Sequence, residues 1–520
     1  MKPTFCPVAC LRAIALVLCS CLFSVTGNGQ NPDRRSQSQV DDREIKQAKQ
    51  AVDAQPGSPD AHLHLGEAYL RANRYEDAID PLKQAIQLKP DLERAHLALG
   101  TVYSELERHD EEILAYKNAL SAIPNSVPLH DRLSRALIQL RRLDEALEIQ
   151  KRTVELSPED GRARVVLGWI LNNLRRFDEA VTQLREAVRL QPDYAPAHFN
   201  LAIAYANMQR LGEALAEYRQ SVEVNPPYSR PAVAYTEISQ ILKTFRRYDE
   251  SIQAGRKAIE IEPRMLDAYC HVARCYYESG RYREAIDVLK AGLVMLPNDP
   301  TLTISLGDNY VGLGQLEDAE KAFRDVMRIT NGSVEVRLRL SSVLSKQGSD
   351  AEAETILRGA VEASPRNTNA HLALSAVLSR QGKTAEAERE DRKAIELEPN
   401  NALVLNNLGY AMLEKGERLE EALKLIQRAV EAAPGEPAYL DSLGFAYYKL
   451  GKYGDGEQYL LEAARRLPNV SEIQEHLGDL YQGWGKIDQA RAAFQRAVSL
   501  STNSNESARL KKKLAALGNK

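Results

Sequence analysis

Apolar residues recur at helical spacing along residues 59–92 and predict two short helices joined by a tight turn. The first helix is marked by Leu63, Leu65, Ala68, Tyr69 and Ala72, and the second by Tyr75, Ala78, Ile79, Leu82, Ala85 and Ile86. Ser58 is a suitable N-cap, Pro59 fits the first helical turn, and Pro90 ends the second helix. Each helix exposes an apolar face that only a neighbour can cover, so the pair predicts a unit that stacks on further units.

The same pattern returns along the chain with a period of about 34 residues. Prolines mark it at positions 90, 124, 158, 192, 226, 263, 297, 365, 399, 434 and 468. A small residue precedes most of these prolines by 24 positions, as Gly66 does, and an alanine precedes many by twelve, as Ala78 does. Two more units, around Gly307 and Gly478, keep the pattern without the proline, which makes thirteen. The small side chains predict that paired helices cross closely, and the period predicts an all-α solenoid.

The pattern divides the chain into five segments. Residues 1–29 form an export signal, residues 30–41 a polar linker, and residues 42–58 a single capping helix. Residues 59–504 hold the thirteen repeats. Residues 505–520 form a final capping helix, in which Leu510, Leu514 and Leu517 face inward and Lys511 to Lys513 face solvent.

The first residues have the features of a secretion signal. Lys2 and Arg12 precede an apolar stretch from Ala13 to Phe23, which is too short for a comfortable membrane span. Cleavage after Gly27 is one interpretation, and a lipoprotein signal with Cys21 as the lipidated residue is another. An uncleaved anchor or a misassigned start are the remaining alternatives. We therefore expect an exported protein that is periplasmic, secreted or associated with an outer membrane.

Composition narrows the possible functions. Lys plus Arg number 68 and Asp plus Glu number 72, so the net charge is −4. This charge does not favour non-specific binding to nucleic acid. Four of the six cysteines lie in the first 21 residues, which excludes a disulfide-built scaffold. Cys270 and Cys275 are five positions apart on one predicted helix, so neither a disulfide nor a redox pair is expected.

Motifs that could carry chemistry have simpler explanations. Five histidines occupy one position of successive or distant repeats, on the order of 10 Å apart or more, so we expect packing rather than metal binding: His62, His96, His130, His198 and His371. Gly382-Lys383-Thr384 lacks the upstream glycine of a phosphate-binding loop and lies in a turn between helices. No catalytic residues, cofactor or metal are predicted, and the protein is not expected to be an enzyme.

The repeat resembles the tetratricopeptide repeat family. The family pattern is met by His62, Leu65, Gly66, Tyr69, Ala78, Leu82, Ala85 and Pro90, and the resemblance covers about residues 42–504. It implies a right-handed superhelix of helix-turn-helix units. It also implies that the first helix of each unit lines a concave groove that binds proteins or peptides.

Candidate groove residues on the first helices combine aromatic rings with amides and one arginine: Trp169, Asn172, Asn173, Phe199, Asn207, Arg274, Tyr277, Tyr410, Phe445 and Tyr448. Aromatic anchors beside amides suit an extended peptide, although each side chain could instead pack against a neighbouring helix. Trp169 and Phe199 are expected as exposed anchors, because the core positions are already filled by Leu167, Leu171, Leu201 and Tyr205.

These features predict a non-enzymatic scaffold that binds segments of partner proteins. No nucleic acid or small-molecule cofactor is expected, and membrane contact only through the N-terminal signal or lipid. Two alternatives remain. The resemblance extends to envelope lipoproteins of this repeat class that scaffold assembly or secretion. The chain could also be a separate recognition subunit of a transferase.

Overall fold

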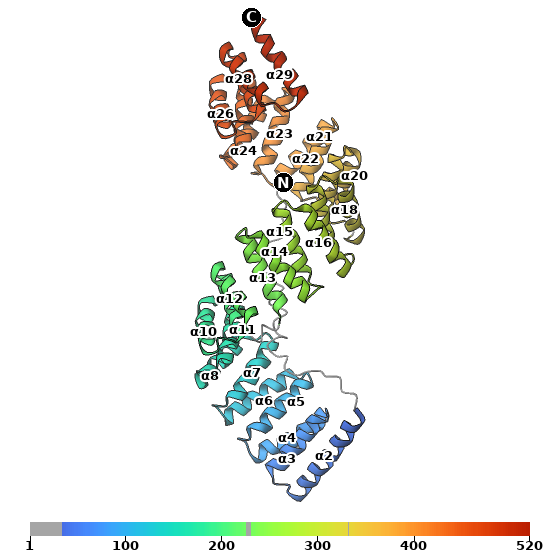
Figure 1. Cartoon of the computed structure of the whole chain (residues 1–520), viewed down its shortest axis with the longest axis vertical. Coiled ribbons are helices and arrows are strands. Elements are labelled where there is room, and N and C mark those ends of the chain that lie inside the picture. Colours follow the sequence, from blue (N-terminus) through green and yellow to red (C-terminus); the bar gives the residue numbers. More distant parts are fainter. Residues whose placement is uncertain (1–33, 225–229, 331, 520) are drawn as a thin grey trace. The chain divides into compact units, whose positions relative to one another are not determined.

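The computed structural model describes residues 34–224, 230–330 and 332–519, and every regular element in these ranges is a helix (Figure 1). The predicted all-α solenoid is therefore confirmed. The chain divides into two compact units, which we call the N-terminal unit (to Ser279) and the C-terminal unit (from Gly280). The export signal predicted for residues 1–29 lies outside the described residues.

Each repeat consists of a first helix, here called an A helix, and a second, called a B helix. The A helices of the N-terminal unit are α3 (Pro59–Arg71), α5 (Glu93–Glu105), α7 (Val127–Gln139), α9 (Gly161–Asn173), α11 (Ala195–Asn207), α13 (Pro231–Thr244) and α15 (Leu266–Glu278). Its B helices are α4 (Tyr75–Leu88), α6 (His109–Ala122), α8 (Leu143–Leu156), α10 (Phe177–Leu190), α12 (Leu211–Glu223) and α14 (Tyr248–Ile261).

The C-terminal unit continues the alternation. Its B helices are α16 (Tyr282–Met295), α18 (Leu316–Thr330), α20 (Asp350–Ala363), α22 (Thr384–Leu397), α24 (Leu419–Ala432), α26 (Tyr453–Arg466) and α28 (Ile487–Leu500). Its A helices are α17 (Pro300–Gly312), α19 (Val334–Lys346), α21 (Thr368–Arg380), α23 (Ala402–Lys415), α25 (Pro437–Lys449) and α27 (Ser471–Gly483). The described ranges thus contain the thirteen predicted pairs, and consecutive helices within each unit pack together.

The first repeat forms as its sequence predicts. The Ser58 side chain accepts a hydrogen bond from the backbone N–H of Ala61 at 3.3 Å and caps α3, with Pro59 in the first turn. A Cβ atom at Gly66 would lie 2.5 Å from Cγ of Leu82 on α4, far inside van der Waals contact. Only glycine or a comparably small residue therefore lets the two helices cross this closely.

In five repeats a histidine at the same position joins the A helix to the turn before it. The Nε2–H groups donate to proline carbonyls six residues earlier, at 2.8–2.9 Å, in His62, His96, His198 and His371. His130 instead bonds the Ser126 carbonyl through Nδ1 at 2.7 Å. Four of the five side chains, those of His96, His130, His198 and His371, are also buried, which agrees with the predicted packing role.

The turn between the A and B helices differs in composition between the two units. Each turn has a residue with a left-handed backbone, and the turn between α23 and α24 has a second one, Arg418, with φ of 50°. In the N-terminal unit the first such residue of a turn is never glycine: Asn73, Glu107, Arg141, Arg175, Gln209 and Arg246 have φ of 56–61°. In the C-terminal unit it is always glycine: Gly280, Gly314, Gly348, Gly382, Gly416, Gly451 and Gly485. The left-handed region costs little for glycine and more for other residues.

The ends of the array are helical, with one correction to the prediction. The N-terminal capping helix α2 spans Arg34–Ala54, so residues 34–41, predicted as a linker, are helical. The Arg and Gln residues of this stretch are good helix formers. At the other end, α29 (Ser504–Ala516) is followed by a short 3₁₀ helix, Leu517–Asn519, and Leu510 and Leu517 are buried as expected.

Candidate functional site

The structure buries both aromatic residues that were predicted to be exposed anchors. Trp169 on α9 and Phe199 on α11 each expose 1% of their surface, and Phe199 packs edge-on against Tyr218 of α12 with ring centroids 5.4 Å apart. Helix α9 contacts α8, α10 and α11, and residues 165–172 are all buried. The prediction is therefore wrong on exposure, because packing covers these positions as well as the regular core positions.

The amides predicted to flank those anchors are used within the helices. Asn172 Nδ2 donates to the Asn200 carbonyl at 3.0 Å, and so ties α9 to α11. Asn173 and Asn207 donate to carbonyls one turn back on their own helices, at 2.8 and 2.9 Å. On α15, the guanidinium of Arg274 pairs with Glu278 at 2.8 Å, and Tyr277 is half-buried. These residues of the N-terminal unit do not gather into one recognisable site.

Three other predicted residues do come together, in the C-terminal unit. Tyr410 of α23 lies 6.0 Å from Phe445 of α25, and Phe445 lies 5.7 Å from Tyr448, measured between ring centroids. The His476 ring of α27 stacks on Phe445 at 4.2 Å. We call Tyr410, Phe445, Tyr448 and His476 the aromatic cluster. Tyr410 and Tyr448 are partly exposed, while Phe445 and His476 lie beneath them, so the cluster has an open surface over a fixed floor.

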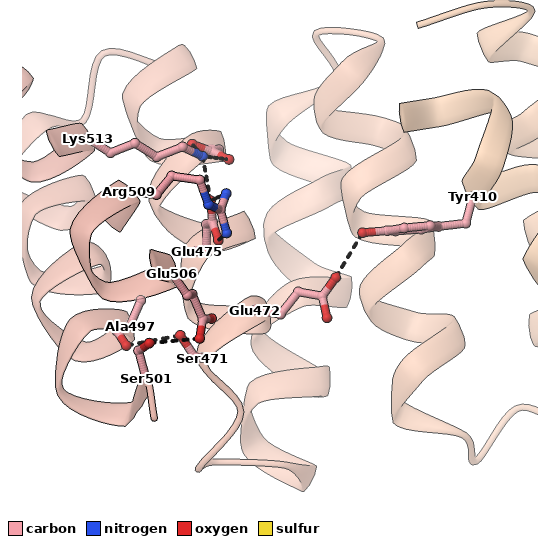
Figure 2. A network of polar contacts seen from close by, with 10 residues as sticks. Tyr410, Ser471, Glu472, Glu475, Ala497, Ser501, Glu506, Arg509 and Lys513 are labelled. Atoms are coloured by element: carbon pink, nitrogen blue, oxygen red, sulfur yellow. Dashed lines mark hydrogen bonds and ion pairs between the residues drawn. The ribbon is translucent and has the colours of Figure 1, made fainter. Parts of the chain in front are cut away.

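A hydrogen bond reaches across the cluster. The Tyr410 hydroxyl donates to Oε1 of Glu472 at 2.9 Å, which joins α23 to α27, two repeats away (Figure 2). Burial and then the nearby Glu472 carboxylate raise the pKa of Tyr410 above its usual value. The phenol therefore remains a hydrogen-bond donor at every physiological pH. A bound partner could replace Glu472 as the acceptor, or replace Tyr410 as the donor to Glu472.

His476 is held by a buried carboxylate. Its Nδ1 lies 3.0 Å from both carboxylate oxygens of Asp441 on α25. Burial is the largest single effect and favours the neutral ring, but the hydrogen bond to Asp441 and the negative charges of Asp441, Glu472 and Asp479 together outweigh it, so the pKa of His476 is raised. The pair fixes the orientation of the ring that supports Phe445. His476 was not predicted as a site residue, although its place in the repeat differs from that of the five packing histidines.

Ion pairs attach the C-terminal cap beside the cluster. Arg509 and Lys513 of α29 both contact the buried Glu475 of α27, and Lys513 also lies 2.7 Å from Asp479 (Figure 2). Lys513 was predicted to face solvent, and this is wrong because two carboxylates of α27 draw it inward. Lys511 and Lys512 are exposed, as expected. The capping helix α29 thus contacts α27, the last A helix, in the place where the next repeat would otherwise pack.

More aromatic rings extend the cluster toward solvent. Tyr453 of α26 lies 6.4 Å from Tyr448 and 6.1 Å from Trp484, again between centroids. Trp484 is partly exposed, and the ammonium of Lys486 sits 3.3 Å from the centre of its ring. Trp484 was missed because it follows α27 at a position where many other repeats carry leucine. Its indole adds an aromatic surface at the edge of the cluster.

The motifs that the sequence raised as candidate chemistry can be placed in the described residues. In the part of the chain that the structure describes, no three His, Cys, Asp or Glu side chains are grouped to hold a metal ion. Gly382-Lys383-Thr384 lies in the turn between α21 and α22, as the sequence predicts. The described helices include none long and apolar enough to cross a membrane. Cys270 and Cys275 are not joined to each other by a disulfide.

Models of the tetratricopeptide repeat match nearly the whole described array. Tetratricopeptide-repeat models cover residues 45–93, 93–126, 132–181, 195–228, 245–303, 310–378, 372–437 and 443–507, and a TPR-repeat model covers 170–209. A stretch of 106 residues is 26% identical to the human protein O-mannosyl-transferase TMTC1, and spans 20% of this chain and only 11% of that protein.

Solved structures with a similar fold include two protein assemblies and one single repeat protein. The APC/C hetero-tetramer Cut9–Hcn1 is 15% identical, with 88% of this chain and 96% of that chain covered and a TM-score of 0.41. Naa15/Naa10 bound to HypK-THB is 14% identical, with 93% and 96% covered and a TM-score of 0.33. YrrB, described as a TPR protein with an unusual peptide-binding site, is 23% identical, with 36% and 97% covered and a TM-score of 0.30.

Proposed function

Because the chain belongs to the tetratricopeptide repeat family, we propose that it is a non-enzymatic scaffold that binds segments of partner proteins through the aromatic cluster of α23, α25 and α27. The partner segment lies across these A helices in extended form. Its apolar side chains contact Tyr410 and Tyr448, and its backbone bonds to polar groups at the rim.

The observation that carries this proposal is the convergence of rings from consecutive repeats. Tyr410, Phe445 and His476 come from three A helices, and neighbouring rings lie within 4.2–6.4 Å of one another. Aromatic groups supply large contact area at small cost in side-chain entropy, and they are enriched among the residues that dominate binding energy. A floor held by the Asp441–His476 pair keeps the rings in place before a partner arrives, which reduces the ordering cost of binding.

Peptides selected on the full chain from a displayed random library test the proposal. Their affinity is measured by fluorescence anisotropy. The double variant Tyr410→Ala/Tyr448→Ala should bind at least tenfold more weakly with its helical content unchanged. Tyr410→Phe is the matched control, because it keeps the ring and loses only the hydrogen bond to Glu472. Unchanged affinity in the double variant contradicts the proposal.

Export from the cytoplasm is part of the same proposal. It is supported by the basic start and the short apolar stretch of residues 13–23. Either cleavage near Gly27 or lipidation at Cys21 would place the scaffold in the cell envelope or outside the cell. Mass spectrometry of the mature protein distinguishes these outcomes, and an intact N-terminus in the cytosol contradicts export.

A recognition subunit for a transferase is the second candidate. It is favoured by the short similarity to a protein O-mannosyl-transferase. In that case a separate catalytic chain should co-purify with the full-length protein, and its capture should depend on the aromatic cluster. Co-purified proteins that include no transferase argue for the first candidate alone.

A further inference from the structure

A groove runs between α16 and α18, two consecutive B helices of the C-terminal unit, with α17 as its floor. Its larger part is a hollow of about 730 Å³, with apolar walls that include Leu293, Leu306 and Ile329. A second hollow of about 460 Å³ shares Tyr310 and Asp318 with the first. The two hollows are therefore adjacent, and each lies within the size range of sites that bind ligands.

Val294 follows the groove residue Lys290 by one helical turn and differs from its counterpart in every other repeat. It exposes 74% of its surface and stands three residues before Pro297. The equivalent residues are all polar or charged: Gln87, Ser121, Glu155, Arg189, Glu223, Glu260, Arg328, Glu362, Glu396, Glu431, Arg465 and Ser499. Such an exposed valine buries nothing within the fold. Four residues after Lys290, Val294 lies on the face of α16 that lines the groove, and the exposed Ile329 lines the groove from α18.

Both walls of the groove carry charges at the spacing of a helix face. Along α16 the groove is lined by Arg283, Asp287 and Lys290. Along α18 it is lined by Asp318, Lys321, Asp325 and Arg328, of which the last two pair with each other. Signs alternate along each wall at intervals of three or four residues. A partner helix repeats its side chains at the same intervals, whereas an extended segment repeats every two residues. The walls therefore complement a helix better than a strand.

We propose that this groove docks an amphipathic α-helix of a partner protein. Apolar side chains three and four residues apart on that helix enter the groove and cover Val294. Charged residues on its flanks pair with the two walls, with a glutamate–lysine–glutamate series facing Arg283, Asp287 and Lys290. This surface belongs to B helices rather than to the A helices that form the aromatic cluster. The two surfaces allow one chain to hold two partner segments of different conformation.

Synthetic peptides test the proposal on the full chain by fluorescence anisotropy. The first peptide carries leucines at helical spacing with the complementary flanking charges, the second has its flanking charges reversed, and the third has a central proline. The first should bind at least tenfold more tightly than either of the others. Val294→Glu, which installs a residue common at the equivalent positions, should weaken it at least tenfold without lowering the unfolding midpoint.

Leu114→Glu is the matched control, because Leu114 is an exposed apolar residue on α6, a B helix of the N-terminal unit. This variant should bind the first peptide as the unchanged chain does. Equal binding of the proline peptide, no saturable binding of the first peptide, or an equal loss in Leu114→Glu overturns the proposal. Sedimentation of the free chain is the last check. A dimer that Val294→Glu converts to a monomer would assign the surface to a second copy of this chain, and would also overturn it.

Discussion

In the N-terminal unit Trp169 is covered by neighbouring helices, whereas in the C-terminal unit Tyr410 keeps part of its ring at the surface. Both residues directly follow the small residue of their A helix, Gly168 and Gly409. The next A helix differs between the two units three residues before its own small residue. It carries Phe199 after the helix of Trp169, and Asp441 after the helix of Tyr410. Phe199 fills space between helices, while Asp441 is smaller and engages His476. Exposure on this face therefore depends on pairs of neighbouring repeats and not on position within one repeat.

The largest expected effect is a difference in stability cost between removing a buried aromatic residue, Trp169, and removing a partly exposed one, Tyr448. Trp169→Ala should lower the free energy of unfolding by about 3–5 kcal/mol, since it removes a fully buried indole and leaves a cavity. Tyr448→Ala should cost clearly less, because part of its ring is already in water. Urea unfolding followed by circular dichroism measures both. If the two variants unfold alike, the contrast between buried and open aromatic residues is wrong.

In one repeat of the C-terminal unit a buried carboxylate replaces a core leucine. Asp391 of α22 occupies the position of Leu82, Leu184 and Leu357, which are fully buried. Burial raises its pKa to about 6, so at pH 7 the folded state holds an unfavourable charge. Asp391→Leu should therefore raise the stability by about 2 kcal/mol at pH 7.

The sign of the pH effect follows from the raised pKa. Protonation removes the penalty, so the gain from Asp391→Leu should shrink as the pH falls from about 6 to 4. Gln150→Leu in the N-terminal unit is the control at the equivalent position. Gln150 is neutral and donates to the Ala163 carbonyl at 2.9 Å. The gain in stability from Gln150→Leu should therefore be smaller than that from Asp391→Leu and independent of pH. A pH-independent gain for Asp391→Leu contradicts the burial of a charge.

The turns give smaller effects of opposite sign in the two units. Gly382→Ala should destabilise by about 1 kcal/mol, because its φ of 74° strains any side chain. No atom lies within 4 Å of the added Cβ, so the cost comes from the backbone alone. Arg175→Gly in the N-terminal unit should stabilise by about 0.5 kcal/mol, since relief of strain exceeds the added freedom of the unfolded chain. Thermal unfolding of both variants shows whether the signs differ as expected.

Acid should destabilise the C-terminal unit by weakening the ion pairs that join its repeats. Glu354 accepts from Lys383 at 2.6 Å and from Arg358, and these contacts lower its pKa to about 2. A lowered pKa stabilises the fold above the unfolded value of about 4.5, and this contribution is lost as the pH falls toward 2. Glu354→Gln should remove that part of the acid sensitivity. An unchanged acid profile in this variant shows that the pair contributes nothing to stability.

Sequence alone predicted the repeats, their small residues and the packing histidines, because each of these follows from contacts within one repeat or with the turn before it. It placed Tyr410, Phe445 and Tyr448 among the groove residues, but misjudged the exposure of Trp169 and Phe199. It also missed His476 and Trp484, whose environment is set by neighbouring repeats. The helix at residues 34–41 was missed because a polar segment gives no apolar periodicity.

Hydrogen–deuterium exchange of the full chain, with and without a selected peptide bound, tests the central claim most directly. If partner segments bind the aromatic cluster, protection should increase on α23, α25 and α27 and stay unchanged on α9 and α11. Protection confined to α9 and α11 would contradict the account, because it would place the binding surface among residues that the structure shows as buried.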